Sequence, residues 1–402
     1  MGLAFQNKLY CATPSILQSL KAKTERGKSM SSLSEKLMSQ PAKAEGGSRI
    51  KQNNINAQDQ KRIAAIKTAV LAEGDRIRAK YPILRHQDAI GMAILLFSMG
   101  GAVLTGWAYL EGVLAWYVTI PVIAIFLSFT HELEHDLIHY MYFRKNKFMH
   151  NLMMSLVWIC RPSTINPWLR RHLHLHHHKH SGTETDLEER AITNGERFTP
   201  LRLLMMLDLE LSVVLRIMKV PKHLRLKALM RGAIGNFPLA SIFYIGWHAY
   251  VAYWAVEAAA WAVGYSVPWP AFVTPELVAT ANTVAVLIFA PNLLRSFSIN
   301  FISSNMHYFG DIEDGNFVQQ CQVLNSKWFI IPHLFCFNFG STHGIHHFVV
   351  RDPFYIRQMT AKKGHEVMRE NGVRFNDLGT FKRANRWSVK EQGQQEAGYQ
   401  AA

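Results

Sequence analysis

Cysteine is scarce in this sequence of 402 residues, which has only four, and none of them stands in a paired spacing. Paired cysteines are typical of disulfide frameworks and of cysteine-ligated zinc modules. The sequence therefore indicates neither. It also contains no internal repeat and no segment recognisable as a fused haem or cysteine-rich electron-transfer domain.

Charged residues are also few, at 18% of the chain, and four long blocks contain none of them: 89–110, 112–130, 233–256 and 277–294. A helix needs about 20 apolar residues to cross the hydrocarbon core of a bilayer, so each block is long enough or nearly so. The pattern predicts an all-α integral membrane fold with four transmembrane helices in two hairpins. A large soluble helical protein with buried helices is the alternative.

Lysine and arginine are distributed unevenly around these blocks. Of the 44, 16 lie in residues 1–88, 16 in 131–231 and 12 from Arg295 onward, while the predicted outer connections 109–112 and 257–276 contain none. Because positive residues stay on the cytoplasmic side, we expect both termini there, together with a helical cap that carries the histidine clusters. The net charge of +15 fits contact with anionic lipid headgroups, and no nucleic-acid partner is expected.

The remaining segments differ in composition. Residues 1–55 are polar and rich in Ser, Lys and Gln, which predicts a flexible segment. Residues 56–402 are expected to form one membrane domain with its core at 85–360. Within it, residues 58–80 have the pattern of a charged amphipathic helix, and 201–215 that of a helix lying in the membrane interface.

Nineteen histidines are unusually many, and they cluster. Residues three and four apart share a helix face, so HELEHDLIH places His131 and His135 together, with His139 next on the same stripe. The segment STHGIHH likewise places three histidines on one helix face: His343, His346 and His347. Neutral imidazole binds iron, copper or zinc, and this spacing lets one helix hold one ion. Both segments therefore predict metal ligation.

The middle cluster, RHLHLHHHKH at 171–180, permits two interpretations. One helical face carries His174, His177 and His178, and the opposite face carries His172, His176 and His180. The first set repeats the HxxHH spacing of residues 343–347, so it is the favoured prediction, with the second as the alternative.

HELEH also matches the zinc-protease signature HExxH, in which Glu132 would be the general base. Such a site needs only one further ligand, which leaves two histidine triples without a role. The same segment matches half of a carboxylate di-iron site, but the second ExxH motif of such a site is missing. A membrane zinc protease and a non-enzymatic metal carrier are the alternatives from other functional classes.

With its hydrophobic blocks and histidine clusters in this order, the chain resembles the membrane fatty-acid desaturase superfamily over about residues 85–360. The resemblance rests on HELEH, on HLHH followed by KHSGTETD, and on HGIHH. It adds His307 in NMHYFG as a ligand. Ser303 stands where such proteins often have Asn, with Asn300 and Asn305 as substitutes. The resemblance implies two irons with nine ligands: His131, His135, His174, His177, His178, His307, His343, His346 and His347.

The resemblance also implies an O₂-dependent oxidoreductase acting on fatty acids or fatty acyl chains, in the first place a desaturase that introduces a C=C bond. The passage HHFVVRDPFY is similar to bacterial members that convert fatty acids into terminal 1-alkenes, which makes decarboxylation the second interpretation. HELEH and NMHY are similar to alkane monooxygenases, which makes hydroxylation the third. Each reaction would take electrons from a separate electron-transfer protein and its reductase.

Charged residues near the three histidine clusters have two interpretations each. Glu132, Glu134 and Asp186 would orient imidazole N–H groups or lie at the surface. Three arginines would hold a substrate carboxylate, whose planar geometry Arg matches, or contact lipid headgroups: Arg161, Arg170 and Arg171.

Overall fold

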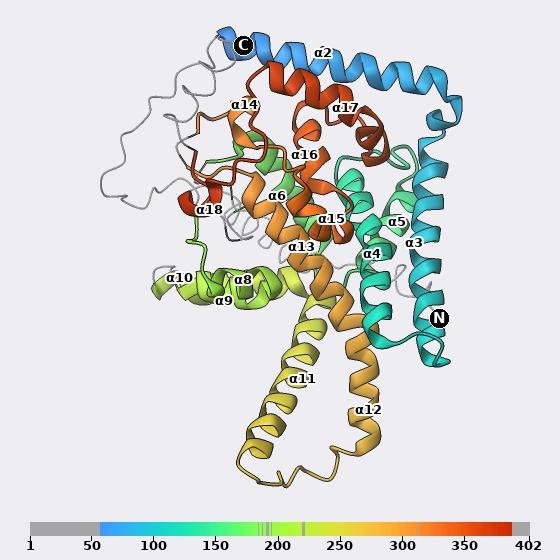
Figure 1. Cartoon of the computed structure of the whole chain (residues 1–402), viewed down its shortest axis with the longest axis vertical. Helices are drawn as coiled ribbons and strands as arrows, with labels where there is room; N and C mark the ends of the chain where they lie inside the picture. The colour runs from blue at the N-terminus through green and yellow to red at the C-terminus, as the bar shows by residue number, and fades with distance from the viewer. Residues whose placement is uncertain are drawn as a thin grey trace, which may run out of the picture. The chain divides into compact units, whose positions relative to one another are not determined.

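The computed structural model describes residues 57–387 apart from 184, 187, 190–192, 194, 219–221 and 311. Contacts divide the chain after Lys51, and all described residues belong to the second unit. The predicted flexible segment 1–55 lies outside the described residues. Among the residues described, all regular structure is helical apart from isolated β-bridges (Figure 1). The predicted helical fold is therefore confirmed.

Among the described residues, three helices are long and apolar enough to cross a membrane: α3 (Gln87–Leu110), α4 (Trp116–Ile138) and the continuous helix Pro275–Met306. The last of these consists of α12 (Pro275–Val284), the π-helical turn η2 (Ala285–Phe289) and α13 (Ala290–Met306). It extends past the predicted block 277–294 and takes in the charged residue Arg295.

The predicted third span forms α11 (Leu239–Ala262), which has the same 24-residue length as α3 but is not one of the three candidate spans. It contains several tryptophan and tyrosine side chains, together with His248 and Glu257. The described part of the chain therefore has three candidate spans where four are predicted.

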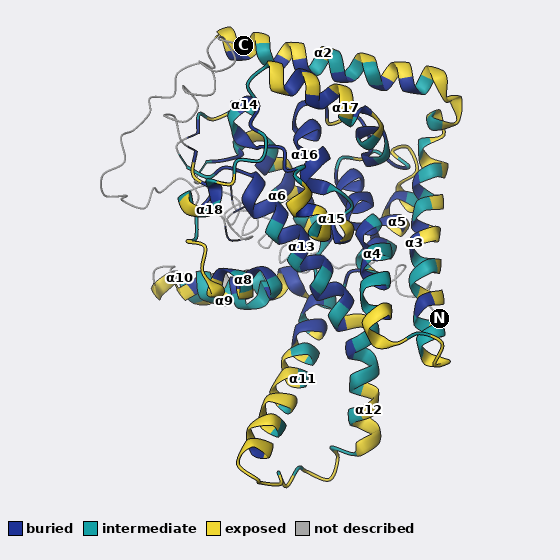
Figure 2. Ribbon diagram, in the orientation of Figure 1, coloured by how far each residue is buried: buried dark blue, intermediate teal, exposed yellow. Residues whose placement is uncertain are grey.

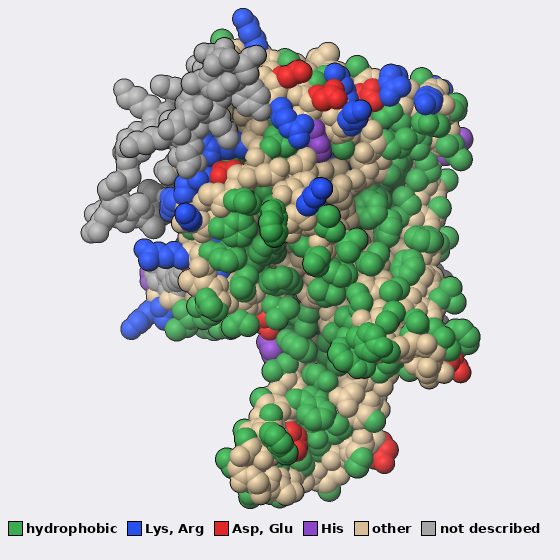
Figure 3. Space-filling view, viewed as in Figure 1, with side chains coloured by type: hydrophobic (Ala, Val, Ile, Leu, Met, Phe, Trp, Pro, Cys, Tyr) green, Lys and Arg blue, Asp and Glu red, His purple; other side chains and the backbone are tan. Residues whose placement is uncertain are grey.

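Helices α11 and α12 form a hairpin whose far end is largely exposed, whereas buried residues gather where α4, α6, α13 and α16 lie (Figure 2). On the face drawn in Figure 3, hydrophobic side chains cover a broad middle zone. Lys and Arg gather around α2 and α10, and the visible end of the hairpin has acidic side chains but no Lys or Arg.

The remaining helices form the histidine-bearing part of the molecule and its surroundings. They are α2 (Ala57–Lys80), η1 (Pro82–Arg85), α5 (Lys147–Ile159), α6 (Pro167–His180), α8 (Pro200–Leu207), α9 (Leu209–Met218), α10 (Lys222–Asn236), α14 (Phe317–Gln320), η3 (Lys327–Phe329), α15 (Ile330–Phe335), α16 (Phe339–Phe348), α17 (Phe354–Glu370) and α18 (Thr380–Arg383).

Local capping determines where two of these helices begin. Asn166 accepts hydrogen bonds from the backbone N–H groups of Trp168 and Leu169, and Pro167 occupies the first position of α6. The predicted interfacial helix 201–215 is instead broken into α8 and α9 at Asp208, whose carboxylate accepts from the backbone N–H of Leu211. A capping aspartate starts a new helix there more favourably than it continues the old one.

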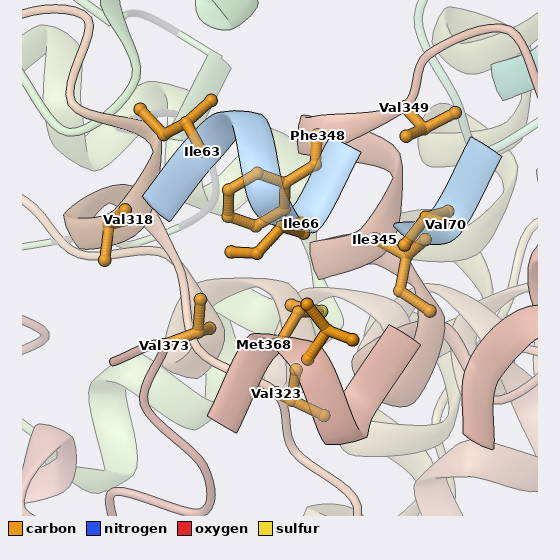
Figure 4. Packing of buried hydrophobic residues seen from close by; sticks show 11 residues of the cluster. Ile63, Ile66, Val70, Val318, Val323, Ile345, Phe348, Val349, Met368 and Val373 are labelled. Carbon is orange, nitrogen blue, oxygen red and sulfur yellow. The ribbon is translucent and has the colours of Figure 1, made fainter. Parts of the chain in front are cut away.

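The predicted helix 58–80 is observed as α2, and it packs along α16 and α17. Ile63, Ile66 and Val70 of α2 lie against Ile345 and Phe348 of α16 and against Met368 of α17 (Figure 4). The three α2 residues are spaced at three and four positions, so they form one apolar stripe. Burial of this stripe attaches α2 to the helix that carries three of the histidines.

Close approach of α3 to the chain after α4 depends on a glycine. A Cβ added at Gly91 would lie 2.5 Å from two ring atoms of Tyr142. That ring cannot easily move, because it is fully buried and its hydroxyl donates to Asp136 at 3.0 Å. Gly100, on the same helix, has no atom within 4 Å of the corresponding position.

We predict that Gly91→Val destabilises the protein by about 1–3 kcal/mol, because overpacking forces the buried ring to shift. The measurement is the melting temperature of the detergent-solubilised protein. Gly100→Val is the matched control on the same helix and should leave the melting temperature almost unchanged. Equal effects of the two substitutions would contradict this account of the helix contact.

Candidate metal centre

Two groups of histidines lie buried or half-buried where α4, α6, α13 and α16 meet. Each group offers nitrogen atoms that all lie within 4.8 Å of one another. The first group contains His135, His139, His174, His178 and His346, and the second contains His177, His307, His343 and His347. Groups of this kind have the donor atoms and the spacing that a transition-metal ion requires.

Helices α6 and α16 each contribute to both groups. His174 and His178 are four residues apart on α6 and belong to the first group, whereas His177 belongs to the second. On α16, His346 belongs to the first group and His343 and His347 to the second. Neighbouring helix positions are rotated by about 100°, so one helix serves both groups from adjacent faces.

Of the nine predicted ligands, the structure brings eight into these groups. His131 lies outside them, and His139 lies inside although it was not among the nine. The side chain of His131 has a ring edge-on to Phe339 at 5.5 Å between centroids, and its Nδ1 accepts from Arg161 at 3.3 Å. HELEHDLIH contains two overlapping four-residue spacings that share His135, and the spacing alone does not distinguish them.

The three alternative histidines of the middle cluster lie outside both groups. His172 is exposed, and the rings of His176 and His180 contact each other at 4.5 Å between centroids. His180 also lies 3.2 Å from the carboxylate of Asp314. The structure thus directs the 174/177/178 face of α6 inward and the opposite face outward.

In the first group, Nε2 atoms face one another at short distances. The Nε2 of His346 lies 3.0 Å from those of His139 and His178, and the Nε2 of His174 lies 3.0 Å from that of His139. These are hydrogen-bond distances, yet every atom involved is a ring nitrogen that can also serve as a metal ligand.

The second group repeats this arrangement. The Nε2 of His347 lies 3.1 Å from that of His343 and 3.2 Å from that of His307. Two nitrogens held at right angles about one ion, each at about 2.1 Å, are about 3.0 Å apart. The spacing in both groups is therefore that of neighbouring ligands on a shared cation.

Carboxylates bind the opposite nitrogen of two of these rings. His174 Nδ1 donates to Glu188 at 2.8 Å, and His177 Nδ1 donates to Asp186 at 2.7 Å. A proton held on Nδ1 leaves a lone pair on Nε2, which is the tautomer that binds metals. Lone pairs directed at one another repel unless a cation lies between them. These residues therefore fit a metal ion, which agrees with the predicted orienting role of Asp186.

His307 is oriented from three sides. Its Nδ1 lies 3.1 Å from the carbonyl of Ser303, 3.2 Å from the Ser303 hydroxyl and 3.3 Å from a carboxylate oxygen of Glu189. Asn300 donates to the carbonyl of Met206 and lines the cavity described below, and Asn305 donates to the carbonyl of Phe301. Ser303 itself therefore occupies the orienting position.

Burial controls the protonation of most of these histidines. Burial and neighbouring imidazoles hold the pKa of His178, His343, His346 and His347 well below the ordinary value. Burial likewise lowers the pKa of His139 to about 2 and that of His307 to about 3. A neutral imidazole has a free nitrogen for a metal, so burial prepares these side chains for ligation.

His177 is the exception. Burial acts to lower its pKa, but the carboxylates of Asp186, Glu189 and Glu188 outweigh burial and raise the pKa to about 9. The same contact lowers the pKa of Asp186. This position therefore attracts positive charge from any source, a proton or a metal ion.

A buried ion cluster joins α4 to α17. Arg357 Nη2 donates to Glu132 at 2.8 Å and to Asp136 at 3.0 Å, and Asp136 also accepts from the backbone N–H of Phe354. A protease of the HExxH type needs its glutamate free to take a proton from water. Here Glu132 is paired with a guanidinium, so the arrangement does not favour the protease interpretation.

A cavity adjoins the two groups. Its polar lining residues include His131, Arg161, Arg170 and Arg295, and its apolar lining residues include Ile165, Leu173, Leu209, Val213, Ile299 and Phe339. An apolar cavity beside a candidate metal centre is suited to an alkyl chain.

Several participating residues do not stand out in the sequence. Glu188 and Glu189 follow the middle cluster and contact histidines of the two groups, and Arg357 and Arg295 lie outside the histidine clusters. The signal for the two glutamates is their position in the acidic stretch DLEE, soon after the box. For the two arginines the signal is an isolated cation in apolar surroundings, which becomes visible only in the fold.

The fold and the site together define a helical protein with candidate membrane spans and a buried polyhistidine centre. Comparison with known families finds a match to the fatty acid desaturase family over residues 111–379, which is more than half of the chain. The chain therefore belongs to the fatty acid desaturase family. Comparison with curated proteins finds no match.

We predict that the first group uses His139 rather than His131. Purified wild-type protein should contain about two irons per chain, because nine imidazoles exceed the coordination number of one ion. His139→Ala should lose about half of this iron or more, whereas His131→Ala should retain it. Metal content is measured by mass spectrometry with inductively coupled plasma.

His172→Ala provides the control for histidine removal as such, since this side chain is exposed and lies outside both groups. Stoichiometric zinc without iron in the wild type would remove the two-iron assignment. Loss of iron in His131→Ala, with retention in His139→Ala, would restore the pairing predicted from HELEH.

Proposed function

We propose that this protein is an O₂-dependent di-iron oxidoreductase of fatty acids or fatty acyl chains, and that its reaction is desaturation. The observation that carries the proposal is the pair of histidine groups beside an apolar cavity in a member of the fatty acid desaturase family. One iron would be held by the group of five histidines and the other by the group of four. When bound and reduced by an external electron donor, the irons supply activation of O₂ and removal of hydrogen from an unactivated methylene.

The chain's own residues contribute orientation and exclusion of water. Asp186 and Glu188 hold protons on the Nδ1 atoms of His177 and His174, and Glu189 lies beside His307. Arg357 neutralises Glu132 and Asp136 at the end of α4, which holds His135 between them in position. The apolar wall of the cavity keeps an alkyl chain, rather than water, next to the histidine groups.

Desaturation takes one hydrogen atom from each of two adjacent carbons. With one O₂, two electrons and two protons, the products are a C=C bond and two molecules of water. The carbon skeleton is unchanged. The electrons come from a separate electron-transfer protein and its reductase, which are part of the proposal.

We also propose that α11 is a fourth span and that the histidine centre faces the cytoplasm. The end of α4 and the end of α13 both supply histidines to the same centre, so both helix ends lie on one side of the membrane. The chain between α4 and α12 must then cross the membrane once more. Within the described residues, α11 is the helix of suitable length for that crossing.

The topology proposal predicts the labelling of two introduced cysteines. Ser266→Cys lies exposed between α11 and α12, and Lys362→Cys lies exposed on α17. In intact cells, a membrane-impermeant maleimide should label the first, and it should label the second only after permeabilisation. The unsubstituted protein gives the background from the native cysteines. Labelling of Lys362→Cys in intact cells would contradict the proposed orientation.

The reaction is tested by product analysis. Cells expressing the protein and supplied with a fatty acid should return mainly an unsaturated acyl chain of unchanged length, detected by gas chromatography of lipids and headspace. His343→Ala is the inactive control, because it lacks a ligand of the second group. A dominant volatile terminal alkene one carbon shorter would replace desaturation by decarboxylation, and a hydroxylated chain would indicate hydroxylation.

A further inference from the structure

Arg295 is a buried cation in an apolar helix. It lies on α13 within the candidate span Pro275–Met306, and its side chain is only 1% exposed. It lines the same cavity as His131, His135 and His343. A charged side chain inside a span is costly, and where one occurs it usually serves a function or has a defined partner.

The partners of Arg295 do not neutralise it. Its Nη2 donates to the hydroxyls of Ser296 at 2.9 Å and Ser163 at 3.3 Å, and its buried Nε has no hydrogen-bond partner. Among the described residues, none of its recorded hydrogen bonds or ion pairs involves a carboxylate. A buried guanidinium without a counter-ion is strongly unfavourable, so an anion is required.

The other arginines near the centre are already engaged. Arg161 forms an ion pair with Glu134, and Arg170 contacts Glu134 at 3.4 Å and Glu188 at 3.1 Å. Arg171 donates to the carbonyl of Leu137 and to His150, and its guanidinium lies over the ring of Tyr140. The three arginines that the sequence suggested for a substrate carboxylate thus have partners within the protein.

The acidic residues of the cavity are engaged as well. Glu134 binds Arg161 and Arg170, Glu188 binds Arg170 and His174, and Glu189 lies beside His307. None of these contacts includes Arg295. The cavity therefore contains one cation without a matching anion, next to an apolar wall that suits an alkyl chain.

We infer that Arg295 binds the carboxylate of a free fatty acid. The inference rests on the proposed function for its substrate class and narrows that class to the unesterified acid. The planar guanidinium matches a carboxylate in two parallel hydrogen bonds, and Ser163 and Ser296 hold the guanidinium from one side. The carbonyl group of an acyl ester or thioester is uncharged, so it cannot replace a carboxylate as the partner of Arg295. The carboxyl end of the substrate therefore lies in the same cavity as the histidine groups.

Binding of matched lipids to the purified full-length chain tests this inference. Palmitate should bind about ten- to hundredfold more tightly than its uncharged methyl ester, measured by the change in tryptophan fluorescence. Arg295→Gln should abolish this preference. Arg295→Lys should keep part of it, because Lys retains the positive charge but lacks the two parallel N–H donors of the guanidinium. Equal affinity of the wild type for the acid and its ester would overturn the inference.

Arg171→Gln is the matched control, since it removes a nearby arginine that does not line the cavity and should preserve the preference. A measurement on the wild type covers the case that Arg295→Gln fails to fold. Palmitate labelled with ¹³C at its carboxyl carbon reports the ionisation of the carboxyl group by NMR. This group should stay ionised to lower pH when palmitate is bound to the protein than when it is in detergent alone. Identical titration in the two environments would count against a guanidinium partner.

Failure of this inference is distinguishable from failure of the proposed function. Iron-containing protein that oxidises palmitoyl-CoA and shows no preference for free palmitate would overturn only the role of Arg295. Protein without iron or oxidase activity that still prefers free palmitate through Arg295 would overturn the proposed function, and would leave the carboxylate site in place.

Discussion

This structure depends on one constraint, the close approach of histidine nitrogens that are directed at one another. The space between these nitrogens is too small for a proton on each of them. At separations of 3.0–3.2 Å, neutral imidazoles with protonated Nδ1 atoms present lone pair to lone pair. The arrangement is tolerable only when a cation lies among them. Glu188 and Asp186 hold the Nδ1 protons of His174 and His177 and so favour this arrangement at those two rings. Carboxylates near the histidine clusters thus orient candidate ligands as well as balancing charge.

Much of the fold follows from the sequence because hydrophobic length is a strong signal. The uncharged blocks predict α3, α4 and the helix Pro275–Met306, and the HxxHH spacing shared with residues 343–347 favours the face of α6 that points inward. The sequence does not choose between His131 and His139, because HELEHDLIH places both four residues from His135. That choice depends on where α4 ends relative to α6 and α16, which is a property of tertiary packing.

Other features escape prediction for related reasons. The histidine triples of α6 and α16 are each divided between the two groups, and this division depends on the angle between the two helices. The periodicity along one helix does not predict that angle. Arg357 meets Asp136 across 221 residues of sequence, and Arg295 lies at the edge of a hydrophobic block where it resembles a residue of the membrane boundary. Their roles become visible only through burial and through the partners that each one has or lacks.

The contact between Arg357 and the acidic end of α4 has a consequence for synthesis of the protein in the cell. Glu132 and Asp136 enter the membrane with an early hairpin, and the arginine that neutralises them is translated more than two hundred residues later. Until then these carboxylates must remain hydrated or protonated, since an unpaired charge is not stable in an apolar interior. During translation the end of α4 is therefore either open to water or carries protonated carboxyl groups, and its ion cluster forms only after α17 has emerged from the ribosome. Under the proposed function, metal binding belongs to that late stage, when the histidines of α16 first come within reach of those on α4 and α6.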